Sequence, residues 1–549
     1  MTRHRRFSIC RAMLLAGTLT LLCNPKAFPV EVSPGDWPEV NHDKLGTRYS
    51  PLALINTSNA KNLKMVCEYK FPDKEPSQSA PIAIGGVIYA SSGHYTVALD
   101  GSDCHAIWTY KWEPRGPELL DSQRGVALAD GKVVRGTPDD FLIALDAKDG
   151  HLIWAKQIAK PSDGYFISMP PLIDRGLVYI GPAGSEWASN GWVGAFRLRD
   201  GEQVWRFNII PADGEPGADT WVPDPSARKH AGGDLWTALS LDTDNEILYV
   251  PGGNPEPDYY DDSRPGANLY TNTLIALNAR TGQLLWYKQF VPHDVHDYDL
   301  EHTQPIIKSK SRTLIVTTGK DGVMRAVDGR THEIVYSKSF TTRFNTDAPM
   351  TTSFARTCPG PFGGNEWNGA AHSPRLETIF VPAVDWCATF KKDASPPDAE
   401  KEHTRGFYFG GEMNFDKWGQ ARGWLTAFDA ASGKMKWRYA ASKPLLGAVT
   451  VTAGDVVLTG ELNGDLVALD GKSGRVLFRG DLGGPIAGGV ATYVARNVQH
   501  VAVVSGYVGV FNMFAPDIGG SNPTISIFRL ATRRSQTRLK MTDAAGKAF

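Results

Sequence analysis

The amino-acid sequence predicts an all-β fold and, within that class, an eight-bladed β-propeller. Two observations carry this prediction. The 549 residues include 56 glycines, 36 prolines, 15 tryptophans and 18 tyrosines, a composition that suits many short strands joined by tight turns, with large rings packed between sheets. In addition, one short segment recurs along the chain, in which an apolar strand, a polar turn and a returning strand end in an aromatic residue.

The recurring segment is legible seven times and is typical of a β-hairpin. The aromatic residues that end the copies are Trp108, Trp154, Trp205, Trp286, Tyr336, Trp437 and Phe478. Each ring can dock against the next repeat, and the copies lie about 40 to 50 residues apart where no insert intervenes, which is the size of a four-stranded blade. A closed ring of blades also protects the strand edges that an open stack would expose.

We expect one propeller domain over residues 32–530, followed by a basic tail over residues 531–549. An eighth blade is expected where a strand at 63–71 pairs with C-terminal strands near 501–508. The wide intervals between Trp205 and Trp286 and between Tyr336 and Trp437 leave room for long loops, where functional sites concentrate.

The first 31 residues are typical of an export signal. Basic residues are followed by an apolar run over 13–22 that is too short to span a bilayer. We therefore expect a soluble mature protein, and the alternative is an N-terminal anchor or a lipoprotein acylated at Cys23, for which Leu22 is a poor preceding residue. A net charge of −1 gives no overall attraction for nucleic acid.

Four of the six cysteines lie in the expected mature chain: Cys67, Cys104, Cys358 and Cys387. An even number is consistent with two disulfides in an oxidising compartment. Their wide spacing disfavours the alternative, a structural zinc site. No Cys-x-x-Cys-His string is present, which excludes a covalently attached c-type haem.

Further strings match a known family. In chain order they are Gly46-Thr47-Arg48-Tyr49-Ser50-Pro51-Leu52, Gly253-Asn254-Pro255, Arg264-Pro265-Gly266-Ala267-Asn268 and Pro292-His293-Asp294-Val295-His296-Asp297-Tyr298-Asp299. Together with the tryptophan-docking hairpins, they resemble the alcohol dehydrogenases that depend on pyrroloquinoline quinone (PQQ). The resemblance extends from about Trp37 to Tyr507. It implies a periplasmic enzyme that oxidises an alcohol, a sugar or an aldehyde by hydride transfer to metal-bound PQQ and passes the electrons to a cytochrome c-type acceptor.

The resemblance implies metal ligands on different repeats. Glu186 and Asn254 offer the oxygen donors that Ca²⁺ and lanthanide ions prefer, although without the family they would be interpreted as a loop carboxylate and a turn residue. Asp297 resembles the metal-bound catalytic base that takes the hydroxyl proton. Asp299 resembles the added carboxylate of lanthanide-dependent members, where it balances a trivalent ion. Sugar-oxidising members with a divalent ion also carry it, so lanthanide(III) and Ca²⁺ both stay open.

The resemblance also implies a set of quinone contacts. Trp236 matches the tryptophan that stacks on the flat quinone, and Lys320 matches a cationic residue beside the reactive oxygens, where it would stabilise developing negative charge. The remaining contacts, which would bind the quinone carboxylates, are Gln78, Arg124 and Ser168. Alone, each could be an ordinary surface residue.

The chain departs from the family in three places. Many members have two adjacent cysteines just before the Arg-Gly step, where this chain has Leu119-Leu120-Asp121-Ser122-Gln123. His296 stands where a tryptophan is usual, and we expect either an altered substrate pocket or an ordinary loop histidine. In the family an asparagine contacts the quinone, and here this residue is either Asn365 or has been replaced by Glu366.

The resemblance further implies the disulfide pairing. The interval from Cys358 to Cys387 is similar to that of a disulfide in methanol-dehydrogenase-like members, which leaves Cys67 to pair with Cys104. Two alternative functions stay open, namely a non-catalytic propeller that binds protein partners and a quinoprotein that binds PQQ without turnover. The oligomeric state is also open, with a homodimer among the options.

Overall fold

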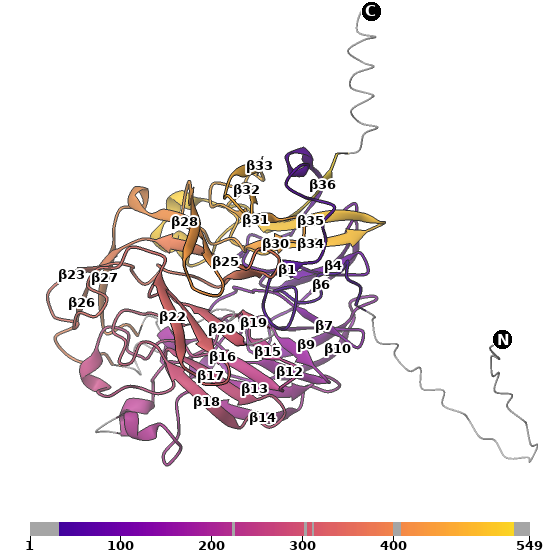
Figure 1. The fold of residues 1–549 in the computed structure, drawn as a ribbon. Coiled ribbons are helices and arrows are strands. Elements are labelled where there is room, and N and C mark those ends of the chain that lie inside the picture. Colours follow the sequence, from indigo (N-terminus) through magenta and orange to yellow (C-terminus); the bar gives the residue numbers. More distant parts are fainter. Residues whose placement is uncertain (1–31, 222–224, 301–304, 310–311, 399–407, 532–549) are drawn as a thin grey trace, which may run out of the picture.

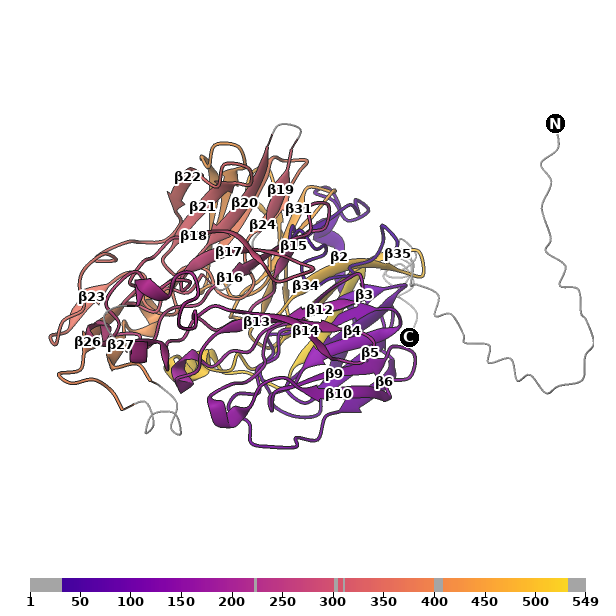
Figure 2. The same cartoon turned by 90° about the horizontal axis from the view of Figure 1, so that it is seen from below.

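The computed structural model describes residues 32–221, 225–300, 305–309, 312–398 and 408–531, which form an all-β propeller. Its strands make nine sheets over these ranges, eight of them with at least four strands. Figures 1 and 2 show the sheets arranged around the molecule in chain order. The predicted signal (1–31) and nearly all of the predicted tail lie outside the described residues. Within the described ranges, no helix has the length and apolar character needed to cross a membrane.

The larger sheets follow the chain almost without exception. The first five are β3–β6 (Ile82–Ile84, Val87–Ser91, Tyr95–Asp100, Ala106–Lys111), β7–β10 (Ala127–Ala129, Lys132–Gly136, Phe141–Asp146, Leu152–Gln157), β11–β14 (Leu172–Asp174, Leu177–Ile180, Trp192–Arg197, Gln203–Asn208), β15–β18 (Ser240–Asp242, Ile247–Pro251, Thr273–Asn278, Leu284–Gln289) and β19–β22 (Ile306–Lys308, Thr313–Thr318, Val323–Asp328, Ile334–Ser339).

The remaining sheets include an insertion and the two ends of the described chain. They are β24-β25-β28-β29 (Ala371–Ser373, Thr378–Asp385, Arg422–Asp429, Met435–Ala441), β1-β30-β31-β32-β33 (Tyr49–Ser50, Thr450–Thr452, Val456–Gly460, Asp465–Asp470, Val476–Asp481), β2-β36-β35-β34 (Leu63–Lys70, Thr524–Leu530, Val498–Ser505, Val490–Ala495) and the three-stranded insert sheet β23-β26-β27 (Ala355–Thr357, Ala388–Lys392, Gly411–Phe415).

Neighbouring sheets are joined by the predicted aromatic docking. The indole N–H of Trp108, at the end of one hairpin, donates to the carbonyl of Ala147 in the hairpin of the next sheet (3.0 Å). Equivalent bonds from Trp154, Trp205 and Trp437 each reach a carbonyl in the sheet that follows their own. The Trp108 ring covers Gly150, whose φ is +78° and where an added Cβ would lie 2.6 Å from the ring. Glycine is therefore required in this turn by its backbone conformation and by the close ring.

At two other junctions between sheets, the turn position that corresponds to Gly150 holds a residue other than glycine. His332 has a positive φ and stacks on Trp286 with ring centroids 4.3 Å apart. Cys104 occupies the same turn position in the first hairpin, also with a positive φ, and forms a disulfide with Cys67 of β2. The disulfide thus takes the place of the aromatic contact where the first and last large sheets meet.

The two ends of the described chain share one sheet. β2 pairs with β36 in antiparallel register from Leu63 with Leu530 to Lys70 with Thr524, and β36 pairs with β35. The sequence correctly predicts that the 63–71 strand joins the C-terminal strands, but its direct partner is β36 rather than the strand near 501–508. In both views the indigo N-terminal strands lie beside the yellow C-terminal ones, and β3 contacts β34.

Candidate active site

The predicted site residues lie at one end of successive sheets. In an antiparallel four-stranded sheet, the connection from the second to the third strand lies at the same end as the link to the next sheet, opposite the docking turns. Second-to-third connections carry Glu186, Asn254 and Lys320, whereas links between sheets carry Arg124, Ser168, Trp236, Asp297 and Asp299. The repeat therefore gathers residues from five sheets at one face.

These side chains line one cavity, whose walls combine aromatic rings with a few charged and polar groups, as is usual for sites that bind small organic cofactors. Eight of the predicted residues line it: Arg124, Ser168, Glu186, Trp236, Asn254, Asp297, Asp299 and Lys320. Gln78 is not among the lining residues. Its amide instead donates to the carbonyl of Val508 (2.8 Å), two residues before Val510, which does line the cavity.

A buried ion-pair cluster forms the floor of the site. The Lys320 Nζ lies 2.9 Å from Asp297 Oδ1 and 2.6 Å from Asp299 Oδ2. Burial alone would lower the pKa of Lys320, but the two carboxylates hold it well above its usual value. Burial raises the pKa of Asp297 well above its usual value, with Lys320 acting in the opposite direction. The cluster therefore contains one cation facing two adjacent carboxyl groups.

Glu186 is positioned by a tight turn. It lies in a 3-10 helix over Ser185–Trp187, preceded by Gly184 with a φ of +139°, where an added Cβ would come within 1.9 Å of the carbonyl of Gly164. Only glycine fits this approach. Burial raises the pKa of Glu186, and Lys320 lowers it.

Asn254 is fixed through both its backbone and its side chain. Its N–H donates to Asp299 Oδ1 (2.8 Å) and its Nδ2 donates to Asp258 Oδ1 (2.6 Å). Sequence reasoning missed Asp258, together with the buried carboxyl groups of Asp234 and Glu256. The signal was weak, because Glu256 and Asp258 stand in a proline-containing segment that is typical of a turn.

Two cationic side chains lie close to the aromatic rings of the cavity. The Arg124 guanidinium lies over the rings of Trp236 (4.8 Å) and Trp367 (5.3 Å), and it donates to Ser168 Oγ (2.7 Å). Lys320 Nζ lies 5.5 Å from the centre of the Trp236 ring. The structure thus brings both predicted cations within 5.5 Å of the ring centre of Trp236, the predicted stacking residue.

The segment that replaces the adjacent cysteines also reaches the cavity. Leu120 and Ser122 line the cavity. Next to this segment, His94 makes charged contacts with Glu75 and Glu118. His94 Nδ1 lies 2.5 Å from Glu75 Oε1, and His94 Nε2 lies 2.9 Å from Glu118 Oε1. The hydrogen bond that His94 donates to Glu75, opposed by burial and aided by Glu118, raises the pKa of His94 to about 9.

This raised pKa predicts a pH-dependent stability. A histidine that gains protons on folding stabilises fully below its unfolded pKa of about 6.5, and its contribution is lost as the pH rises through the folded value. We therefore expect the thermal unfolding midpoint of the wild type to fall between pH 6.5 and pH 9.5. The fall should be smaller in Glu118→Gln, measured by circular dichroism at both pH values. An equal fall in the two proteins would contradict a stabilising role for this contact.

The other two departures from the family pattern, at His296 and at Asn365-Glu366, differ in how they relate to the cavity. His296 is buried and stacks on Tyr298 (5.2 Å between ring centroids), and burial lowers its pKa to about 4; it is not among the cavity-lining residues. Asn365 accepts from Thr318 (2.7 Å) and donates to Pro382 (3.0 Å), whereas Glu366 lines the cavity. Burial, opposed by Lys320, raises the pKa of Glu366 to about 7.

Part of the cavity lining is apolar and comes from late segments of the chain. Its lining residues here are Phe362, Phe409, Met413, Val510, Phe511 and Phe514. Phe511 and Phe514 belong to the short helix α2 (Phe511–Phe514), and Met413 lies on β27 of the insert sheet. Phe362 stacks on Phe511 with ring centroids 4.5 Å apart, so the helix and the Phe362 loop form one wall.

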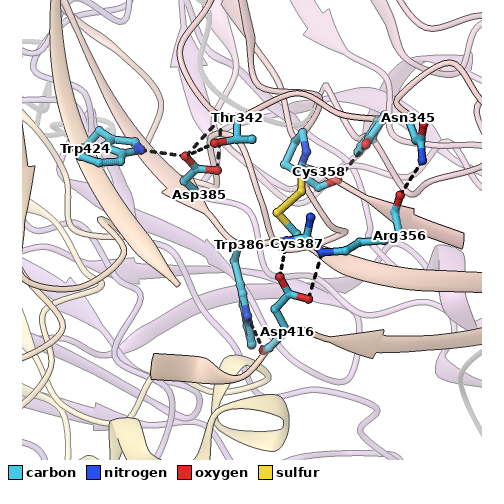
Figure 3. The surroundings of a disulfide bond; sticks show 11 residues. Thr342, Asn345, Arg356, Cys358, Asp385, Trp386, Cys387, Asp416 and Trp424 are labelled. Atoms are coloured by element: carbon cyan, nitrogen blue, oxygen red, sulfur yellow. Dashed lines mark hydrogen bonds and ion pairs between the residues drawn. A yellow bond between two sulfur atoms is a disulfide. The ribbon is translucent and has the colours of Figure 1, made fainter. Parts of the chain in front are cut away.

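The second disulfide links two neighbouring strands of the insert sheet. Cys358 follows β23 and is bonded to Cys387, which precedes β26. Figure 3 shows the bond beside Arg356, which pairs with Asp416, and Trp386, whose indole donates to the Asp416 carbonyl (2.8 Å). Both disulfides expected from the sequence are therefore present in the structure.

Comparison with known proteins agrees with this fold. A family model described as the β-propeller domain of glucose, ethanol and alcohol dehydrogenases, of the PQQ type, matches residues 37–337. A second model, that of the outer membrane protein assembly factor BamB, matches residues 421–510. The propeller, the aromatic platform and the carboxylate cluster define a quinoprotein dehydrogenase. The chain belongs to the PQQ-dependent alcohol dehydrogenase family, and it is an enzyme of that family.

Individual relatives cover most of the chain. The dehydrogenase subunit of a quinone-type alcohol dehydrogenase from Gluconacetobacter polyoxogenes is 30% identical, over 88% of this chain and 73% of the relative. A lanthanide-dependent methanol dehydrogenase from Methylorubrum extorquens is 29% identical, over 90% and 91%. The solved structure of a europium-containing methanol dehydrogenase superposes with a TM-score of 0.83 at 25% identity, covering 91% of this chain and 99% of that one.

The residues present fit both a quinone and a metal ion. Trp236 and Arg124 offer a ring face and a guanidinium for a planar polycarboxylate. Around Glu186, Asn254 and Asp297, buried carboxyl oxygens of Asp234, Glu256, Asp258 and Glu366 have no hydrogen-bond partner within the described ranges. Such buried negative groups are normally compensated by a cation. A hard, oxygen-binding ion is the cation that this donor set suits.

Proposed function

We propose that this enzyme oxidises alcohols with an apolar chain by using PQQ and a metal ion held by Glu186, Asn254, Asp297 and Asp299. The observation that carries the proposal is the Lys320 ion pair with Asp297 and Asp299, placed in one cavity with Trp236 and Arg124. When bound, the quinone supplies a two-electron acceptor and the ion supplies Lewis acidity. The chain would supply the base and the surrounding charge.

Asp297 is the proposed catalytic base. It would take the hydroxyl proton while the carbon-bound hydrogen leaves as a hydride, which converts a primary alcohol to an aldehyde. Lys320 would stabilise negative charge that develops on the acceptor oxygens, and Trp236, Arg124 and Ser168 would orient the ring system. Gln78 would act from behind the wall through Val508, since it does not line the cavity.

The apolar lining contributed by the late segments of the chain supports the substrate class. A sugar presents many hydroxyl groups, and burying them against Phe409, Met413 and Phe511 without hydrogen bonds would cost free energy. An alcohol with an alkyl or aromatic chain would instead gain from burial of apolar surface. We therefore propose apolar primary alcohols ahead of sugars and aldehydes.

The wider setting of the enzyme is also part of the proposal. We propose that the eight sheets with four or more strands are eight blades of a single domain over 32–530, with 531–549 as a tail. The region 1–31 would export the chain to the periplasm. There a cytochrome c-type protein would accept the electrons, and the protein could work as a monomer or a homodimer.

The test is reconstitution of chelator-treated protein. We expect protein stripped with EDTA to lose dye-linked activity, because the carboxylates of the site then lack their counterion, and to regain it with PQQ plus La³⁺ or Ca²⁺. Activity is measured by reduction of an artificial dye with methanol, 1-hexanol or benzyl alcohol as the substrate. We expect kcat/KM to be at least about tenfold higher for the two larger alcohols, because several more CH₂ groups are buried.

Two other outcomes would favour the alternative functions. If PQQ and metal change neither the absorption spectrum of the protein nor its activity, the protein is instead a binding scaffold. Saturable PQQ binding without turnover would favour an inactive quinoprotein.

A further inference from the structure

We propose that Asp258 is a positioning residue for the metal site: it orients Asn254 and, with Glu256, adds negative charge that favours a trivalent ion over a divalent one. The inference rests on the proposed function, because it concerns the same ion. It adds two residues that do not line the cavity and that lie behind the ligand Asn254 rather than beside the quinone.

The first step concerns the direction of the Asn254 side chain. A carboxamide has one oxygen, which a hard cation binds, and one NH₂ group, which repels cations. An ionised carboxylate can only accept hydrogen bonds, so the group facing Asp258 Oδ1 at 2.6 Å must be the Asn254 Nδ2. The same NH₂ group also reaches the carbonyl of Pro255 (3.3 Å). With its nitrogen held in this way, Asn254 keeps its oxygen free for a metal.

The second step concerns burial. Asn254, Glu256 and Asp258 are 3%, 1% and 1% exposed, so neither carboxyl group is screened by bulk water. The backbone N–H of Asn254 is held by Asp299 (2.8 Å). Asn254 is therefore held at its backbone by Asp299, itself a proposed ligand, and at its side-chain amide by Asp258.

The third step concerns charge that is not paired. Glu256 accepts the N–H of Asp258 through Oε2 (3.0 Å), but Glu256 Oε1 and Asp258 Oδ2 have no hydrogen-bond partner in the described part of the chain. Arg264, a buried cation nearby, donates to the backbone carbonyls of Pro257, Asp258 and Asp294 instead of to these carboxylates. Arg264 therefore acts on these two carboxylates only through charge at a distance, and the structure gives them no direct ion pair with it.

The consequence is selectivity by ion charge. The attraction between a fixed carboxylate and an ion grows in proportion to the charge of the ion. Two buried carboxyl groups behind Asn254 therefore stabilise a trivalent ion more than a divalent ion at the same position. This contribution is separate from that of Asp299, because Asp299 pairs directly with Lys320.

The test measures ion affinity rather than turnover. Binding of Tb³⁺ to EDTA-treated protein is followed by luminescence sensitised by nearby tryptophans, and Ca²⁺ binding is measured by calorimetry on the same protein. Asp258→Asn and Glu256→Gln remove charge but keep an oxygen acceptor, whereas Asp258→Ala removes both charge and acceptor. Asp262→Asn is the matched control, because Asp262 is an exposed carboxylate on the same segment.

We expect Asp258→Asn to weaken Tb³⁺ binding on the order of tenfold and Ca²⁺ binding by less, so that the ratio of the two affinities falls. Glu256→Gln should shift the ratio in the same direction. Asp258→Ala should weaken both ions beyond Asp258→Asn, and Asp262→Asn should change neither. An unchanged ratio in Asp258→Asn would overturn the charge role, and equal affinities in Asp258→Asn and Asp258→Ala would overturn the orienting role. If the wild type binds neither ion, the proposed function itself fails.

Discussion

Asp297→Asn is expected to lower kcat of dye-linked alcohol oxidation by about 10²- to 10⁴-fold, the range for loss of a general base. An amide has nearly the shape of the carboxyl group but cannot take a proton from the substrate. The Lys320 pair with Asp299 remains in this variant, so the floor of the cavity should keep one of its two carboxylates. The measurement is steady-state kinetics of the protein reconstituted with PQQ and either La³⁺ or Ca²⁺.

A second variant separates the base from a general loss of structure. Asp297→Glu keeps a proton acceptor but moves it by one CH₂ group, and we expect it to retain more activity than Asp297→Asn. In both variants, the change in absorption on addition of PQQ should reach saturation, which shows that the cofactor still binds. If Asp297→Asn turned over at the wild-type rate while binding PQQ, Asp297 would have no role as the base.

Removal of the Cys67–Cys104 disulfide should produce the second large effect. The bond closes a 37-residue loop, for which the chain-entropy treatment gives about 4 kcal/mol of stabilisation. It also holds β2 against the first large sheet at the one junction where a disulfide occupies the docking position. We expect Cys67→Ala/Cys104→Ala to lower the urea midpoint of unfolding strongly, measured by tryptophan fluorescence.

The other disulfide offers a matched control. Cys358–Cys387 closes a 29-residue loop, so loop closure alone predicts nearly the same stabilisation. It holds the insert sheet rather than a junction between large sheets. A larger loss in Cys67→Ala/Cys104→Ala would measure the added contribution of that junction, whereas equal losses would show that only loop closure matters.

The sequence predicts the propeller because its information is local. Each hairpin is encoded within about a dozen residues, and the turn glycine is required by a neighbouring ring, as Gly150 is by Trp108. The site residues were predicted from the family resemblance, and the repeat brings them to one end of successive sheets. Eight predicted site residues therefore lie together although they are spread from Arg124 to Lys320 along the chain.

The parts that could not be predicted depend on contacts between distant segments. Phe409 and Phe511 line one cavity although about a hundred residues separate them, and no periodic pattern encodes their meeting. Asp258 was missed because an acidic residue near prolines is usually a solvated turn residue, and only the structure shows it buried against Asn254. The contact of Gln78 with Val508, a residue 430 positions away in the chain, could not be predicted for the same reason.

The sheet shared by β2 and β36 constrains the order in which the protein can be completed during synthesis. Cys67 and Cys104 both emerge early, so their bond can form while most of the chain is still unmade. One edge of β2 then stays unpaired until its partner strand, Thr524–Leu530, has been synthesised. Until that point the nascent protein carries open strand edges on β2 and β35, which can pair with other chains. A chain interrupted shortly before residue 524 would thus contain every proposed active-site residue and still be prone to aggregation.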